Sequence, residues 1–177
     1  MKKIIFPAIG ILFLATVLVF FDFNENEQTI FDFESCVATQ KETSLIYPGR
    51  CTAKDGRTFV QDIGNELEKT NLIRASSPRP GMLVKSPLTI EGEARGYWYF
   101  EASFPIKIID SSGVEIARGI ATAKEEWMTE EFVPFEAVLS FDTPAGGVGK
   151  LILMKDNPSG LPEHDDALVI PIKFSGE

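Results

Sequence analysis

The feature that most restricts the fold of this chain is a two-residue alternation of apolar and polar side chains over its C-terminal half. Successive side chains of a β-strand point to opposite faces, so such alternation predicts strands with one buried face. Turn-forming sequences rich in Gly, Pro, Asn and Ser separate the alternating runs. The apolar members of the four clearest runs are Leu88 and Ile90; Phe104, Ile106 and Ile108; Val133, Phe135, Ala137, Leu139 and Phe141; and Leu168, Ile170, Ile172 and Phe174.

Residues 82–175 therefore read as about seven short strands without a long helix. Short strands at regular spacing, each with one apolar face, indicate an antiparallel β-sandwich of the immunoglobulin-like class. This segment contains no cysteine, so it lacks the inter-sheet disulfide of antibody domains. The predicted fold class is all-β, with additional segments placed before the sandwich.

The N-terminal segment has a different composition. Lys2 and Lys3 precede 18 residues without a charge, Ile4 to Phe21, which is close to the minimum length that crosses a bilayer core. We expect residues 1–21 to form an uncleaved signal anchor, with the N-terminus cytoplasmic and the body outside the cell membrane. The alternatives are a cleaved signal peptide and a buried helix of a cytosolic protein. Bulky residues throughout 16–21 argue against cleavage there.

The charge of the remaining chain excludes one class of partner. After Phe21 there are 15 basic and 26 acidic residues, a net charge of −11. Nucleic-acid binding requires Lys and Arg to displace phosphate counterions, so we expect no nucleic-acid partner.

The sequence also contains few candidate catalytic residues. The chain has one histidine, His164, and no Gly-x-Ser-x-Gly motif. We therefore expect no enzyme activity, no cofactor and no metal.

Two cysteines divide the segment before the sandwich. Cys36 and Cys51 lie in a polar stretch, and outside the cytoplasm we expect them to form a disulfide; two free thiols are the alternative. The expected organisation is an acidic spacer at 22–34, a small disulfide-closed module at 35–75 and a Pro-rich linker at 76–81. Within the module, Asp55-Gly56 predicts a hairpin with a type I′ turn, and residues 61–72 predict a helix.

The most distinctive candidate site is the aromatic segment after Arg95. We expect Arg95, Tyr97, Trp98 and Glu101 to form an interaction patch, because Arg, Trp and Tyr dominate interface energetics. The alternative is a structural corner, in which Gly96 permits a bend and an Arg95–Glu101 pair holds it. As a strand, residues 97–100 would carry aromatic side chains on both faces, one of them buried.

Two acidic segments are further candidate sites. Residues 124–131 contain four glutamates around Trp127 and are typical of a solvated loop. The oxygen-rich segment 156–166 offers a weak calcium site as an alternative, although its spacing matches no EF-hand.

One segment resembles a known family. Ser86 to Phe104 contains a Ser-Pro start, a strand ending in Gly92, then Ala-Arg-Gly, aromatic residues and Phe-Glu-Ala. This order is similar to the opening of the Gmad2 family, the immunoglobulin-like domain of bacterial spore germination proteins. Residues 132–139, 151–155 and 169–172 resemble its later strands. The resemblance covers about residues 82–174 and implies an extracytoplasmic β-sandwich of a bacterial envelope protein.

These observations together predict a membrane-anchored, extracytoplasmic, non-catalytic binding or assembly module of the bacterial cell envelope. Its expected partner is an envelope protein or a cell-wall glycan, and it contacts the membrane through residues 4–21. One alternative is a purely structural accessory domain of an envelope complex. The other is a cell-wall glycan-acting accessory or weak hydrolase.

Overall fold

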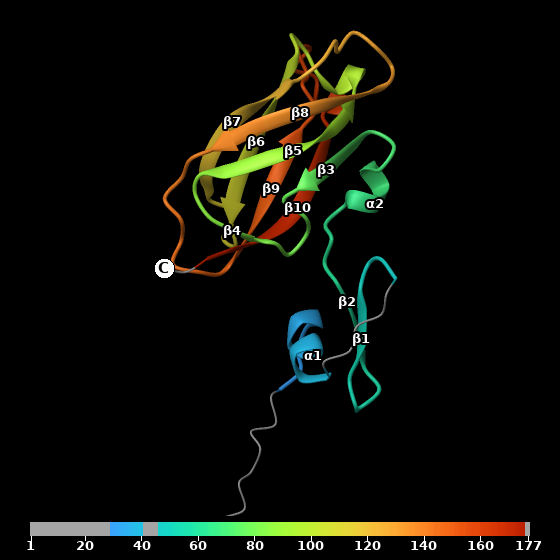
Figure 1. Cartoon of the computed structure of the whole chain (residues 1–177), viewed down its shortest axis with the longest axis vertical. Coiled ribbons are helices and arrows are strands. Elements are labelled where there is room, and N and C mark those ends of the chain that lie inside the picture. Colours follow the sequence, from blue (N-terminus) through green and yellow to red (C-terminus); the bar gives the residue numbers. More distant parts are fainter. Residues whose placement is uncertain (1–28, 41–45, 176–177) are drawn as a thin grey trace, which may run out of the picture.

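The computed structural model describes residues 29–40 and 46–175, which form a curled eight-stranded sheet and a small module stacked at one end of it (Figure 1). The strand order in the sheet is β3-β5-β8-β7-β6-β9-β10-β4, and its described pairs are antiparallel except β10–β4. The strands are β3 (Ile73–Ser77), β4 (Leu83–Val84), β5 (Leu88–Arg95), β6 (Ser103–Asp110), β7 (Glu115–Ala123), β8 (Phe132–Leu139), β9 (Val148–Met154) and β10 (Ala167–Phe174).

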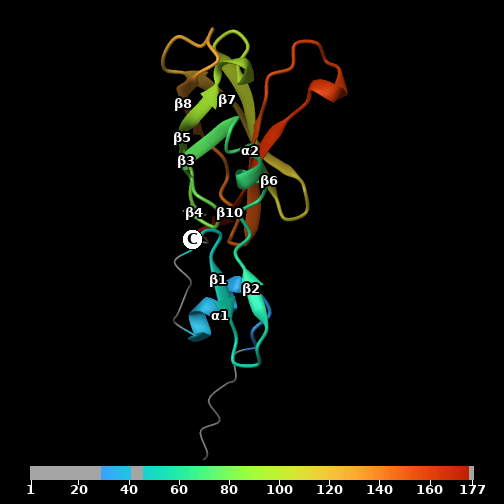
Figure 2. The same cartoon turned by 90° about the vertical axis from the view of Figure 1, so that its right-hand side faces the viewer.

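The sheet folds over between β7 and β8. These strands pair only at Thr122 with Glu136 and at Ala123 with Phe135, whereas β7 pairs with β6 along most of its length. As a result, the layer β3-β5-β8 faces the layer formed by β6, β9 and β10 (Figures 1 and 2). The expected β-sandwich is confirmed, and all seven strands expected after residue 82 are present.

The core between the layers contains the alternating residues that the sequence singled out. Phe104, Ile106 and Ile108 of β6 are buried, as are the corresponding apolar residues of β8 and β10. The rings of Phe104 and Phe135 meet edge to face, with centroids 5.0 Å apart, across the sandwich. The hydrophobic effect thus acts on one face of each strand, which explains why the period-two pattern predicted the fold.

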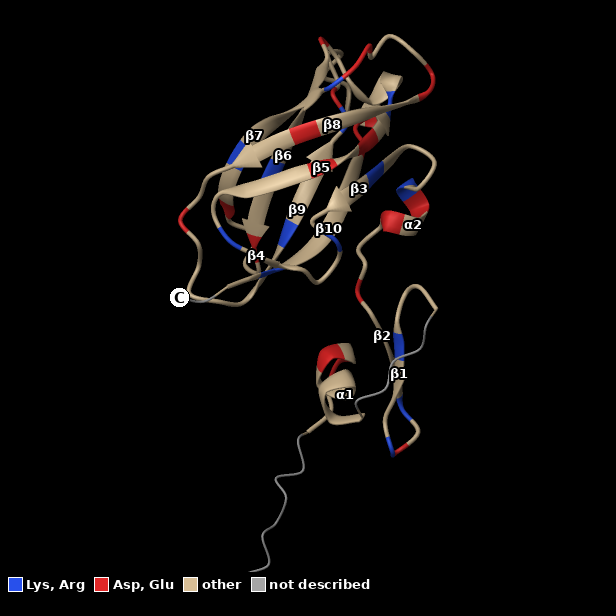
Figure 3. Ribbon diagram, viewed as in Figure 1, with Lys and Arg blue, Asp and Glu red and all other residues tan. Residues whose placement is uncertain are grey.

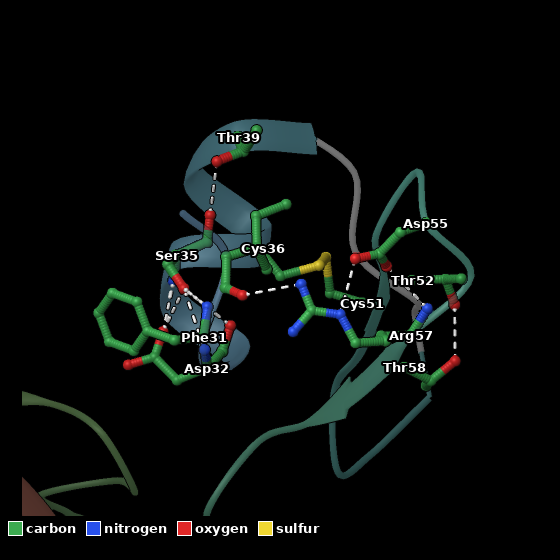
Figure 4. The surroundings of a disulfide bond; sticks show 11 residues. Phe31, Asp32, Ser35, Cys36, Thr39, Cys51, Thr52, Asp55, Arg57 and Thr58 are labelled. Atoms are coloured by element: carbon green, nitrogen blue, oxygen red, sulfur yellow. Dashed lines mark hydrogen bonds and ion pairs between the residues drawn. A yellow bond between two sulfur atoms is a disulfide. The ribbon is translucent and has the colours of Figure 1, made fainter. Parts of the chain in front are cut away.

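The module is closed by the expected disulfide, which joins α1 (Phe33–Gln40) to β1 (Arg50–Thr52) (Figure 4). The Cα atoms of Cys36 and Cys51 are 6.0 Å apart, and both residues are buried with Ala53 in a small separate core. At the start of α1, the Ser35 N–H donates to Asp32 Oδ1 over 2.8 Å, which is a capping interaction. The hydrogen bond from the Ser35 hydroxyl to Asp32 Oδ1, followed by the bond from the Ser35 N–H, holds the pKa of Asp32 below its ordinary value.

The hairpin turn differs in type from the expectation. β1 pairs antiparallel with β2 (Thr58–Val60), so the hairpin itself is confirmed. The Gly56 N–H donates to the Ala53 carbonyl, and only Gly56 in this turn has positive φ, whereas a type I′ turn needs two such residues. Asp55 instead accepts hydrogen bonds from the Arg57 N–H and guanidinium (Figure 4), and these bonds lower its pKa.

Two boundaries before residue 82 also differ from the expectation. Ser76 and Ser77 lie at the end of β3, which pairs with β5 and buries Ile73 and Ala75 in the sandwich core, so the expected linker begins inside a strand. The expected helix over 61–72 is reduced to α2 (Glu66–Lys69). Both differences arise because this part of the chain packs along the sheet. Local sequence does not show that contact.

Gly64 and Asn65 show how this segment is held. The Asn65 side-chain amide makes two hydrogen bonds with the backbone of β10. Its Nδ2 donates to the Ala167 carbonyl, and its Oδ1 accepts from the Val169 N–H. Gly64 has φ +62°, and a Cβ atom there would overlap the Val169 carbonyl oxygen. The close approach covers the outer edge of β10 and prevents an earlier start of the helix.

This contact yields a prediction with a matched control. Gly64→Ala will destabilise the sandwich by more than the ~1–2 kcal/mol expected for a left-handed alanine, because the backbone must also retreat from β10. Gly113→Ala is the control, because Gly113 has φ +85° and open space around its Cα. Equal losses of unfolding free energy in urea titrations would show that the contact with Val169 carries no energy.

The expected membrane anchor at 1–21 and most of the spacer at 22–34 lie outside the described residues. Within the parts of the chain that the structure describes, no helix is long and apolar enough to cross a bilayer.

Candidate functional site

The aromatic segment after β5 forms a tight corner. Residues Gly96–Trp98 make a single 3₁₀ turn, so they do not continue the strand as expected. A Cβ atom on Gly96 would overlap the carbonyl oxygens of Trp127 and Thr129, and the Gly96 N–H donates to the Glu131 carbonyl over 3.1 Å. Trp98 is fully buried in the core beneath this corner.

Arg95 holds the same corner, although through partners other than the expected one. Its Nε donates to the Asn71 carbonyl over 3.1 Å, and its Nη1 donates to the Glu130 carbonyl over 3.2 Å. The guanidinium lies 4.1 Å from the ring centroid of Phe132 and 3.6 Å from Glu131 Oε2. The expected Arg95–Glu101 pair is therefore wrong: Glu101 is exposed in the next turn, where its φ is +50°.

The four aromatic residues at 97–100 separate into buried and exposed pairs. Trp98 and Tyr99 are buried, and the Tyr99 hydroxyl donates to the Val133 carbonyl over 2.7 Å. Burial raises the pKa of Tyr99 well above its ordinary value. Tyr97 and Phe100 are 49% and 42% exposed, so they remain available for contact. The expected four-residue patch is thus divided, with Arg95 and Trp98 in the packed corner and Tyr97 and Glu101 outside it.

Three segments meet at this end of the sandwich, and we call residues 96–102, 124–131 and 155–166 the distal loops. The Asp156 N–H donates to the Trp98 carbonyl, and Gly96 bonds Glu131, so the loops adjoin one another. They lie at the end of the sandwich opposite the module (Figure 2). Besides Tyr97 and Phe100, they expose Met128 and Leu161.

The distal loops are strongly acidic. They contain nine acidic and two basic residues, and red ribbon segments, which mark Asp and Glu, gather at this end in Figure 3. Glu125 and Glu130 are exposed and form no ion pair with the described residues, as expected for a solvated loop. Burial, and more weakly the charge of Glu101, raise the pKa of Asp156. This end of the molecule therefore combines exposed apolar side chains with negative charge.

The described residues contain no group of three or more His, Cys, Asp or Glu side chains that could hold a metal ion, and the weak calcium alternative at 156–166 gains no support. His164 Nδ1 lies 3.0 Å from Ser159 Oγ. In a serine-hydrolase triad the acid bonds Nδ1 while the serine bonds Nε2. Asp165 instead accepts a hydrogen bond from Asn157, so this exposed pair does not have the geometry of a triad.

The sequence did not predict an ionic cluster around the buried Glu66 carboxylate. Glu66 of α2 is 7% exposed and bonds both the Tyr47 hydroxyl and the Arg79 guanidinium, joining the chain before β1 to the segment after β3. Burial, followed by the hydrogen bond with Glu66, raises the pKa of Tyr47 to about 12. No local pattern marks these residues, because they are 13 to 32 positions apart in sequence.

The packed corner, the antiparallel layers and the alternating core define an immunoglobulin-like β-sandwich. The chain belongs to the Gmad2 family, described as the immunoglobulin-like domain of bacterial spore germination, whose model matches residues 72–161. The match begins at the residue before β3, in agreement with β3 as a strand of the sandwich. Comparisons with curated proteins and with solved structures found no match.

Proposed function

We propose that this protein is an extracytoplasmic, non-catalytic binding module of the bacterial cell envelope, held at the membrane by residues 4–21. The distal loops are the binding surface, and an envelope protein is the partner. The supporting observation is the exposure of Tyr97 and Phe100 on loops that a rigid corner positions. Binding residues commonly lie on loops held by a rigid scaffold, and exposed aromatic side chains are frequent at interfaces.

The shape of the chain agrees with this role. The described N-terminal residues belong to the module, and the distal loops lie at the other end of the molecule (Figures 1 and 2). An anchor before the module would therefore hold the loops away from the membrane. A disulfide that closes a small module also suits an oxidising compartment.

A purely structural role is the second candidate. The complete burial of Trp98 and the backbone bonds of Arg95 favour it, because both side chains stabilise a corner and Trp98 offers no surface. This observation removes Arg95 and Trp98 from the proposed binding surface and leaves Tyr97, Phe100 and the acidic loops. The glycan-acting alternative gains no support from the geometry of the described residues.

A photo-crosslinking experiment tests the binding role. A photoreactive phenylalanine analogue placed at Phe100 in the full chain is expected to form one discrete adduct in intact envelopes, and Tyr97→Ala is expected to reduce its yield several-fold. The same analogue at Phe31, which is 73% exposed in the module, is the matched control. Equal adducts from both positions, or no adduct from Phe100, would contradict a binding surface at the distal loops.

A further inference from the structure

Among the described residues, one strand edge in the middle of the sheet is paired over only part of its length. β7 pairs with β6 from Ser103 to Ile109, but it pairs with β8 only through Thr122 and Ala123. Among the described residues, the edge of β7 from 115 to 121 that faces away from β6 pairs with no strand. We call the gap between this edge and β8 the β7–β8 seam.

The direction of the free backbone groups follows from the pairing. The Ala123 N–H donates to Ala102 on the β6 side, whereas the Lys124 N–H donates to Pro134 on the β8 side. Backbone groups alternate between the two edges of a strand, so the N–H and C=O groups of Arg118 and Ile120 face the seam. The register agrees, because Pro105, which has no N–H, lies opposite Ile120.

The closed end of the seam is hollowed, and its walls mix apolar and polar side chains. A groove of about 400 Å³ lies where β7 begins to pair with β8, lined by Ile120, Ala137 and Val138 together with Thr122, Lys124 and Glu136. Ile120 and Val138 are 63% and 59% exposed. The Leu139 side chain approaches Gly119 below the groove, so the core closes its floor.

The charges along the seam are paired within the chain. Lys124 Nζ lies 2.8 Å from Glu136 Oε2, and these are the charged residues that line the groove. Nearby, Arg118 Nε donates to Glu115 Oε1 over 2.8 Å. An occupant of the groove would therefore find no unmatched charge, which favours an uncharged one.

The outer edge of β10, in the same sheet, is covered, unlike the edge of β7. The outer edge of β10 is covered by Asn65, Gly81 and Met82, which bond its backbone from residue 167 to 173. Natural proteins blunt free edges with charges, prolines or covering segments, because an open edge pairs with other chains. Between residues 116 and 121, β7 carries no proline and a single charge, that of Arg118.

We propose that the β7–β8 seam binds an extended, uncharged segment of another polypeptide, which pairs with β7 as an added strand. The backbone groups of Arg118 and Ile120 supply the hydrogen bonds, and alternate apolar side chains of the segment contact Ile120 and Val138. This mode of recognition obtains affinity from the backbone and specificity from every second side chain. A second copy of this chain suits the seam less well, because a symmetric pairing centred on the free segment sets the two Arg118 side chains opposite each other.

Amide hydrogen exchange on the full chain tests this proposal with a defined probe, the capped peptide acetyl-Thr-Val-Thr-Val-Thr-amide. The peptide is expected to slow exchange at Arg118 and Ile120 in a saturable manner. The same peptide with N-methylated valines is the control, because it keeps the side chains but cannot donate hydrogen bonds from the valines. We expect the N-methylated peptide to bind at least about tenfold more weakly.

A variant of β7 provides a second, independent test of the proposal. Ile120→Pro removes an N–H that the β6 ladder does not use, so the fold is expected to persist while peptide affinity falls at least about tenfold. Equal affinity for the two peptides, or protection confined to other strands, would overturn the proposal. Concentration-dependent dimers that Ile120→Pro abolishes would also overturn it, by identifying a second copy as the occupant.

Discussion

Trp98→Ala is expected to lower the free energy of unfolding of the sandwich by about 3–5 kcal/mol, the range found for deleting a large buried aromatic side chain. Trp98 is fully buried, and the corner above it is fixed by Gly96 and Arg95, so the surrounding structure has little freedom to collapse into the cavity. Urea titration followed by far-ultraviolet circular dichroism measures the loss.

The neighbouring residue provides the control. Tyr97→Ala alters an aromatic residue that is about half exposed and is expected to change stability by no more than ~0.5 kcal/mol. Trp98→Phe should cost less than Trp98→Ala, because it keeps a ring and removes an indole N–H that has no acceptor among the described residues. If Trp98→Ala and Tyr97→Ala lower the free energy of unfolding equally, the corner around Trp98 does not support the sandwich.

Removing the disulfide through Cys36→Ser with Cys51→Ser is expected to destabilise the module by about 3 kcal/mol on the chain-entropy model for a loop of this size. The module core is small, with Cys36, Cys51 and Ala53 as its buried residues, so we expect the module to unfold. The sandwich has a separate, larger core and should remain folded. Hydrogen exchange resolved by segment distinguishes the two parts.

In that experiment, protection at β1 and β2 should disappear while protection at β8 and β10 persists. Treating the unaltered chain with a reductant under mild denaturation serves as a second route to the same state. Simultaneous loss of protection in both parts would instead show that the Glu66 cluster and the Glu34–Lys173 ion pair, with Oε1 and Nζ 3.0 Å apart, make them one cooperative unit.

Much of the sandwich was predictable because burial acts on one face of each strand. The five-member alternation at 133–141 predicted β8 together with its inward side chains, and the runs in β6 and β10 did the same. The two cysteines predicted their own pairing, and the Ser-Pro to Phe-Glu-Ala order predicted the family. These features are local in the sequence or strictly periodic, so they can be predicted without knowledge of the tertiary contacts.

The candidate site was predictable only in part. The sequence placed four aromatic residues together, but a strand and a 3₁₀ turn distribute them differently between core and surface. Arg95 had several acidic residues within reach, and the pairing of β5 with β8 brought it beside Glu131 and Phe132 in place of Glu101.

The sequence by itself determined the class of fold and the disulfide, because periodicity and cysteine count are properties of the chain, and it offered the corner at Gly96 as one of two interpretations. Only the tertiary structure decided that β3 belongs to the sandwich, that Glu66 is buried against Arg79 and Tyr47, and that β7 leaves an open edge. Each of these three features depends on contacts between segments that are distant in the sequence. Strand pairing across the whole fold determines which of those segments are in contact.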